Sequence, residues 1–178
     1  FAPKDGCPFC RMERMLEEQY CEFVTGDAMM EPLIRIETNK KGFCNRHFTR
    51  MTQVGQKLPN ALILESHLQE ILDQYMPKRA GKPDKKQLEA LDGMLHSCYV
   101  CERVDKDMLH LTSTVFSECA KGGEFRQTYR EQPFICLHHY RFMMAAANGK
   151  GGLPSKLLAD FHAETLPLVK AGSFCRAF

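Results

Sequence analysis

The chain has 178 residues, of which 44% are hydrophobic and 26% are charged, and its formal net charge at pH 7 is +2. These values describe a soluble protein of one or two domains with a packed core, and they exclude an intrinsically disordered chain. A net charge this small gives no extended positive field, so nucleic acid is not an expected partner. No apolar run approaches the ~18 residues that span a bilayer, so no membrane segment is expected.

Apolar residues recur at helical spacing in the first part of the chain. One run, from Phe9 to Val24, contains Met12, Met15, Leu16, Tyr20 and Phe23, with a face of Glu13, Glu17 and Glu18 that we expect to be solvated. A second run, from Leu58 to Tyr75, contains Leu58, Ala61, Leu62, Leu68, Ile71, Leu72 and Tyr75 on one predicted face. Pro59 suits the first turn of that helix. Each run predicts an amphipathic helix.

The segment from Pro77 to Lys86 predicts a linker. It contains two prolines, one glycine and five basic residues. Aromatic residues do not interleave with the basic ones, as they do in proteins that bind single strands, so a solvated linker is favoured over a nucleic-acid patch. A further helix is expected near Gln87 to Leu95.

The second half of the chain repeats the helical pattern. The apolar positions of its two longest runs are Val104, Met108, Leu111, Val115 and Phe116, and Leu157, Leu158, Phe161 and Leu168. Sustained alternation of the kind that marks a strand is absent from the sequence. The fold class predicted is therefore all-α, with about eight helices in two halves plus the helix after the linker.

A set of metal-type residues occurs twice in the same order. Cys7-x-x-Cys10 is followed by Cys44-x-x-His47, and Cys98-x-x-Cys101 is followed later by Cys136-x-x-His139. The string LPNALILESH follows the first set and LPSKLLADFH follows the second. This order predicts two tandem, duplicated helical units of about four helices each, at residues 1–76 and 87–178, joined by the linker at 77–86.

Three thiols and one imidazole are the ligands of a tetrahedral Cys3His zinc site. The tandem arrangement predicts one site from Cys7, Cys10, Cys44 and His47 and another from Cys98, Cys101, Cys136 and His139. Four protein ligands leave no open position, so both predicted Zn²⁺ sites are structural. Iron or an iron–sulfur cluster is the alternative, because thiolates also bind those.

Three further histidines are candidates for groups that support the ligands. His67 and His162 each lie two residues after an acidic residue, in the last long predicted helix of each half. His138 directly precedes His139. A supporting role near the metal is one interpretation. Ordinary positions on the flank of a helix are the other.

Cys21, Cys119 and Cys175 remain outside the two sets and are interpreted as structural or incidental. An odd total of nine cysteines in a helical chain favours metal-bound thiolates in a reducing cytoplasm over a disulfide framework. The first residue is Phe1 and not Met, so a signal peptide removed before it stays an open alternative.

The strings CPFCRMERMLEEQY, NKKGFCNRHF and LPNALILESHL resemble those of a bacterial family with paired CPxC and GFCxxH motifs and no assigned function. The resemblance covers most of the chain and implies a bacterial, cytoplasmic, metal-binding protein, but no reaction. The second set departs from the pattern, with CYVC and FICLHH in the corresponding places.

Three functions are compatible with these features. The first is a non-enzymatic binding or adaptor module that holds a protein, peptide or small-molecule ligand, because the P-loop and the GxGxxG, HExxH and GxSxG motifs are absent from the sequence. The second is a redox- or metal-responsive sensor that uses the CxxC thiolates. The third is a metalloenzyme with one open or iron-containing site.

Overall fold

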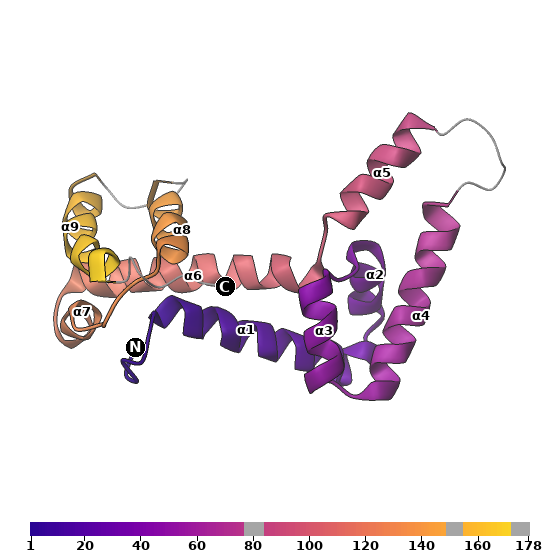
Figure 1. The fold of residues 1–178 in the computed structure, drawn as a ribbon, viewed down its shortest axis with the longest axis horizontal. Coiled ribbons are helices and arrows are strands. Elements are labelled where there is room, and N and C mark those ends of the chain that lie inside the picture. The colour runs from indigo at the N-terminus through magenta and orange to yellow at the C-terminus, as the bar shows by residue number, and fades with distance from the viewer. Residues whose placement is uncertain (77–83, 149–154, 172–178) are drawn as a thin grey trace. The chain divides into compact units, whose positions relative to one another are not determined.

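The computed structural model describes residues 1–76, 84–148 and 155–171, and these residues form helices and connecting turns without a strand (Figure 1). The all-α prediction is confirmed. Within this part of the chain there are nine α-helices and one short 3₁₀-helix: α1 (Pro8–Val24), η1 (Asp27–Met30), α2 (Pro32–Lys41), α3 (Asn45–Val54), α4 (Lys57–Gln74), α5 (Lys85–Leu95), α6 (Tyr99–Lys121), α7 (Glu124–Arg130), α8 (Leu137–Asn148) and α9 (Ser155–Ala171). Among these helices, none is long and apolar enough to cross a membrane.

Local signals set several helix boundaries. The first two predicted helices agree with α1 and α4 to within one residue. Asp84 caps α5, because its carboxylate accepts a hydrogen bond from the backbone N–H of Lys86. The predicted linker at 77–86 is therefore wrong at Lys85 and Lys86, which lie in α5, while residues 77–83 lie outside the described part of the chain.

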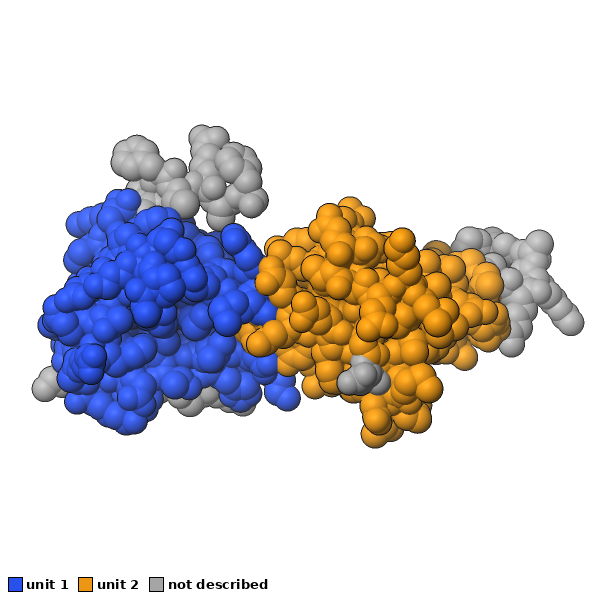
Figure 2. Space-filling view, turned by 90° about the horizontal axis from the view of Figure 1, so that it is seen from below, with its two compact units in different colours: residues 1–15, 106–178 blue, residues 16–105 orange. Residues whose placement is uncertain are grey.

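The chain divides into two compact units. Unit 1 comprises residues 1–15 and 106–178, and unit 2 comprises residues 16–105 (Figure 2). The boundaries fall inside α1 and inside α6, so each of these helices contributes residues to both units. This division differs from the predicted tandem units at 1–76 and 87–178, because unit 1 takes both ends of the chain and unit 2 takes its middle.

The core of unit 1 is built around α9, which packs against α7 and α8. The ring centroid of Phe161 lies 4.6 Å from that of Phe116 and 5.4 Å from that of Tyr129. Tyr129 is fully buried, and its hydroxyl is hydrogen-bonded to that of Thr165 at 2.7 Å. Aromatic edge contacts with satisfied hydroxyls stabilise such a core beyond the burial of area alone.

The core of unit 2 lies where α4 packs against α2 and α3 (Figure 1). Met51 of α3 and Ile63 of α4 are buried there. The predicted inner face of α4 is wrong in part: Leu58, Leu68 and Leu72 are 68%, 49% and 59% exposed. Apolar residues occur on more than one side of this helix, so spacing alone did not identify the side that α2 and α3 cover.

Candidate metal centres

Four predicted ligands of unit 1 meet at the starts of two helices, and we call this group site 1. Cys7 directly precedes α1 and Cys10 lies in its first turn, while Cys136 directly precedes α8 and His139 lies in its first turn. His139 Nδ1 lies 3.2 Å from the sulfur of Cys136, 3.4 Å from that of Cys10 and 3.9 Å from that of Cys7. The sulfurs of Cys10 and Cys136 are 3.6 Å apart.

Unit 2 contains an equivalent group, which we call site 2. Cys44 precedes α3 and His47 lies in its first turn, while Cys98 precedes α6 and Cys101 lies in its first turn. His47 Nδ1 lies 3.3 Å from the sulfurs of Cys44 and Cys101 and 3.4 Å from that of Cys98. The sulfurs of Cys44 and Cys101 are 3.8 Å apart.

These distances fit a single four-coordinate ion in each group. Metal–sulfur bonds of about 2.3 Å and metal–nitrogen bonds of about 2.0 Å at tetrahedral angles place two sulfurs about 3.8 Å apart and a sulfur and a nitrogen about 3.5 Å apart. In both groups, all four ligand atoms lie within 4.8 Å of one another. Disulfide bonds would require sulfurs about 2.05 Å apart, and the eight cysteines in the described part of the chain are free.

The predicted grouping of the ligands is wrong. Cys7 and Cys10 lie with Cys136 and His139 rather than with Cys44 and His47, and Cys98 and Cys101 lie with Cys44 and His47. Each CxxC turn thus meets the CxxH helix from the other half of the sequence. The reason is that α1 and α6, which begin at the CxxC turns, are shared between the two units.

A carboxylate faces the second ring nitrogen of each candidate histidine ligand. Glu17 lies 3.4 Å from His47 Nε2, and Glu13 lies 3.5 Å from His139 Nε2. Both glutamates belong to α1. When Nδ1 binds a metal, Nε2 carries the proton, and a carboxylate that accepts it fixes the ring and strengthens the ligand. Neither contact was predictable from the sequence, because glutamates on an acidic face of a helix are usually solvated.

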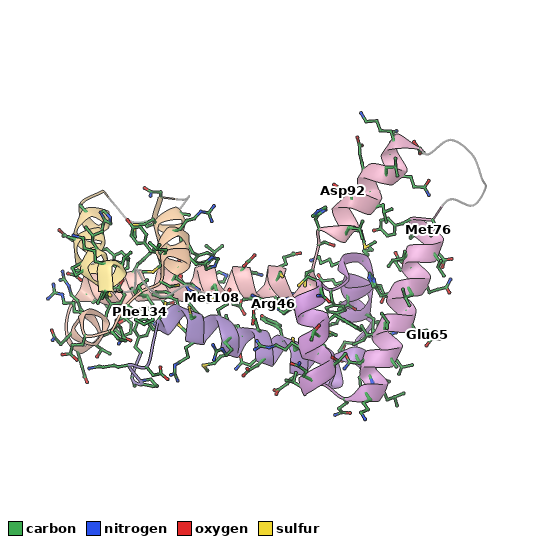
Figure 3. The ribbon with its side chains drawn as sticks, in the orientation of Figure 1. Arg46, Glu65, Met76, Asp92, Met108 and Phe134 are labelled. Atoms are coloured by element: carbon green, nitrogen blue, oxygen red, sulfur yellow. The ribbon has the colours of Figure 1, made fainter. Side chains whose placement is uncertain are left out.

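Glu17 is only 7% exposed, so the prediction of a solvated face is wrong at this residue. Its carboxylate also contacts the guanidinium of Arg46, labelled in Figure 3, and that of Arg50, the latter at 2.6 Å. Two guanidinium groups offset the cost of burying the charge. Both arginines belong to α3, so these contacts attach the start of α3 to α1.

Burial and neighbouring thiols shift the pKa values of the candidate ligands. Burial, with Arg46 and Arg50 nearby, lowers the pKa of His47 to about 4, which keeps the ring neutral as a metal ligand must be. Burial also opposes the charged form of His139, but hydrogen bonds with the Cys136 and Cys7 thiols outweigh it and raise its pKa to about 9.

The thiols shift in opposite directions within one group. Hydrogen bonds from Cys10 and Cys136 hold the pKa of Cys7 well below its usual value, while hydrogen bonds with Cys136 and Cys7 raise the pKa of Cys10. Burial raises the pKa of Cys101 in the other group. Without a cation, closely packed thiols cannot all be ionised, because the charge on one thiolate opposes the ionisation of its neighbours. A cation at the centre stabilises all the thiolates at once.

The three other candidate histidines lie outside the two ligand groups. His67 Nδ1 donates a hydrogen bond to the Asn39 carbonyl at 2.8 Å, and His162 Nε2 is hydrogen-bonded to the Tyr140 hydroxyl at 2.7 Å. His138 is exposed, its ring centroid lies 5.1 Å from that of His139, and it groups with His139 and Glu13. Of the three, His138 lies beside a candidate ligand, and its supporting role stays a prediction.

Two of the remaining cysteines are packing residues. Cys21 and Cys119 are buried, and burial raises the pKa of Cys21 to about 11 and that of Cys119 to about 12. Protonated, buried thiols pack as small hydrophobic groups and are unreactive. Cys175 lies outside the described residues.

A family profile matches residues 1–172 of the chain. The chain belongs to the family of unknown function DUF6062. The match confirms the resemblance to a family without an assigned function, and it does not bear on the paired motifs. The comparisons found no match among curated proteins and none among solved structures.

Proposed function

We propose that this protein is a zinc-binding helical module, non-enzymatic, in which two structural Cys3His sites position surfaces for a binding partner. The observation that carries the proposal is that in both groups three sulfurs and one Nδ1 converge within 4.8 Å. Each site would connect a CxxC turn to a helix start far away in the sequence. The metal would then contribute directly to folding.

Zinc is the ion best supported by the donor set. Mixed thiolate and imidazole ligands in a tetrahedral arrangement suit Zn²⁺, and four protein ligands leave no position open for a substrate. An iron–sulfur cluster divides its four ligands among two or four irons, and the inorganic core between the ligands needs more room than these groups enclose. Free thiols at all eight described cysteines support a reducing compartment such as the cytoplasm.

Metal analysis of the purified protein, prepared without oxygen, tests the proposal. We expect two zinc ions per chain and no visible absorption. Replacement of zinc by Co²⁺ is expected to give the intense visible bands of a tetrahedral thiolate site. Stoichiometric iron, a charge-transfer spectrum of the protein as isolated, or a chain that folds fully without metal would contradict the proposal.

A redox-responsive role is the second candidate. It is favoured by the partial exposure of Cys10, Cys44 and Cys101, which leaves at least one thiolate of each site open to small oxidants. Zinc release on mild peroxide treatment, recorded with a metal-binding dye and reversed by a thiol reductant, supports this role. Full retention of zinc under the same treatment would exclude it.

A further inference from the structure

Unit 2 contains a small apolar cavity that the metal sites do not use. Its volume is about 130 Å³, and it is lined by Phe43, Phe48, Met51, Ile63 and Leu64, with Asn60 and His67 as the polar groups. An apolar cavity of about 150 Å³ holds one benzene molecule in another protein. The cavity in unit 2 therefore has the size of a single six-membered ring.

His67 uses its ring N–H elsewhere, and Asn60 uses one of its two amide N–H groups elsewhere. His67 Nδ1 donates to the Asn39 carbonyl at 2.8 Å, so in the neutral ring Nε2 is an acceptor. Asn60 Nδ2 donates to the Met51 carbonyl at 2.8 Å. Asn60 Oδ1 is buried and has no hydrogen-bond partner in the described part of the chain. The two acceptors, His67 Nε2 and Asn60 Oδ1, therefore favour a ligand that brings a hydrogen-bond donor.

In unit 1, the corresponding histidine, His162, is hydrogen-bonded to a phenol hydroxyl, that of Tyr140. Tyr140 follows His139 as Phe48 follows His47. His162 ends one copy of the repeated LPxxLxxxxH string, and His67 ends the other. In unit 1 the Tyr140 and His162 rings are stacked at 5.9 Å and joined by the 2.7 Å hydrogen bond between hydroxyl and Nε2. In unit 2 the residue beside the ligand histidine is Phe48, which has no hydroxyl.

We propose that the cavity of unit 2 binds a small one-ring phenol, whose hydroxyl donates to His67 Nε2 and whose ring packs among the apolar side chains. The ligand would supply to His67 the kind of hydroxyl that Tyr140 supplies to His162. Carboxylates and carbonyl compounds are disfavoured, because their oxygens are acceptors and would lie against two further acceptors, His67 Nε2 and Asn60 Oδ1. The inference specifies the binding role proposed above and does not depend on the identity of the metal.

Titration of the metal-loaded full chain with phenol and with benzene tests this proposal. The methyl signals of Met51, Ile63 and Leu64 in ¹³C NMR spectra report occupancy of the cavity. A ligand of seven non-hydrogen atoms is expected to bind with a dissociation constant of roughly 0.1–3 mM. Benzene, which has no donor, is expected to bind about fivefold to tenfold more weakly.

Two variants sharpen the test. Phe48→Tyr places a hydroxyl on the cavity wall and is expected to weaken phenol binding by at least about tenfold. Phe23→Tyr makes the same chemical change on an exposed ring of unit 2 and is expected to leave binding unchanged. His67→Phe is expected to abolish the preference for phenol over benzene.

Three results would overturn the inference. They are an absence of saturable shifts with phenol at millimolar concentration, equal affinity for benzene, and unchanged phenol binding in Phe48→Tyr. A cavity that takes neither ring is a packing void or a socket for a partner's side chain. Zinc content measured on the same sample separates such a failure from a failure of the metal proposal.

Discussion

Each candidate histidine ligand presents its two ring nitrogens to different partners. Nδ1 faces three thiols, and Nε2 faces a carboxylate of α1: Glu17 for His47 and Glu13 for His139. When an ion binds at Nδ1, the carboxylate favours the proton on Nε2 and helps to orient the ring. The two environments also differ, because Glu17 is buried with two arginines whereas Glu13 is partly exposed.

Glu17→Gln is expected to weaken metal binding at site 2 about tenfold to a hundredfold, because the neutral amide is a weaker acceptor for His47 Nε2–H. Competition with a chelating dye measures the affinity of each ion. Glu18→Gln is the matched control, because Glu18 is adjacent in sequence and its side chain is 47% exposed. An unchanged affinity in Glu17→Gln would remove the proposed role of this carboxylate.

Glu164 provides a second prediction, on pH dependence. Burial opposes the charge of this carboxylate, but hydrogen bonds from Arg126 and Arg130 outweigh burial and lower its pKa below the usual 4.5. A carboxylate with a lowered folded-state pKa stabilises the fold above its unfolded pKa, and that contribution is lost as the pH falls through the folded value.

Glu164→Gln is therefore expected to reduce the free energy of unfolding by about 1 kcal/mol at pH 7. The difference from the parent protein should shrink progressively below about pH 4.5 and disappear in acid. Urea unfolding of both proteins across this range measures it. Glu118→Gln, which breaks the exposed pair with Lys121, is the control and should change stability little at any pH.

At the scale of elements, every candidate ligand lies at the start of a helix. Unsatisfied backbone N–H groups and the positive end of the helix dipole favour thiolates there. The two members of each motif are three residues apart, which places one before the helix and the other in its first turn on the same side. Four helix starts, those of α1, α3, α6 and α8, thus provide both sites.

The end of α2 depends on Gly42 for two reasons. Its φ is +59° with ψ at −158°, a conformation that residues with a side chain avoid. A Cβ at this position would also lie 2.6 Å from His67 Nε2. Gly42→Ala is therefore expected to lower the free energy of unfolding by about 1–3 kcal/mol.

Gly93→Ala is the matched control for that change. Gly93 lies inside α5 with open space around it, so a methyl group there is expected to raise the free energy of unfolding by about 0.5–1 kcal/mol. Thermal or chemical unfolding of both variants measures the two effects. Equal effects of the two substitutions would show that the backbone at Gly42 is not constrained.

At the scale of the whole molecule, each site takes its ligands from both halves of the sequence. Site 1 connects the turn before α1 to the start of α8. Site 2 connects the start of α3 to the start of α6, and both of these lie between α1 and α8 in the sequence. Each ion would close a long loop and reduce the entropy of the unfolded chain. Loss of the ion at site 1 would release the N-terminal turn from unit 1.

Paired substitutions test this topology by counting ions. Cys7→Ser with Cys136→Ser removes two ligands of site 1, so we expect one zinc ion per chain to remain. Cys7→Ser with Cys44→Ser removes one ligand from each site and is expected to lower the affinity for both ions. Tandem sites would give the opposite result, with the first pair affecting both ions and the second pair affecting only one.

The sequence predicted local features of this protein well. Helical spacing identified α1 and α4 almost to the residue, and the buried positions Val104, Met108, Val115 and Phe116 of α6 were expected. The motif residues also fell into two groups of three cysteines and one histidine. Each of these depends on neighbours within a few residues, where spacing along the chain directly fixes the relative positions of side chains.

Only the tertiary structure decided which CxxC motif shares a site with which CxxH motif. Cys7 and Cys10 could reach either CxxH helix as far as spacing is concerned, and the choice of Cys136 and His139 depends on α1 and α6 being shared between the units. The same holds for Glu17, which is buried because α3 brings Arg46 and Arg50 to it, and for the cavity beside His67. A sequence records which residues favour burial or metal, but contacts between distant segments arise only when whole helices pack.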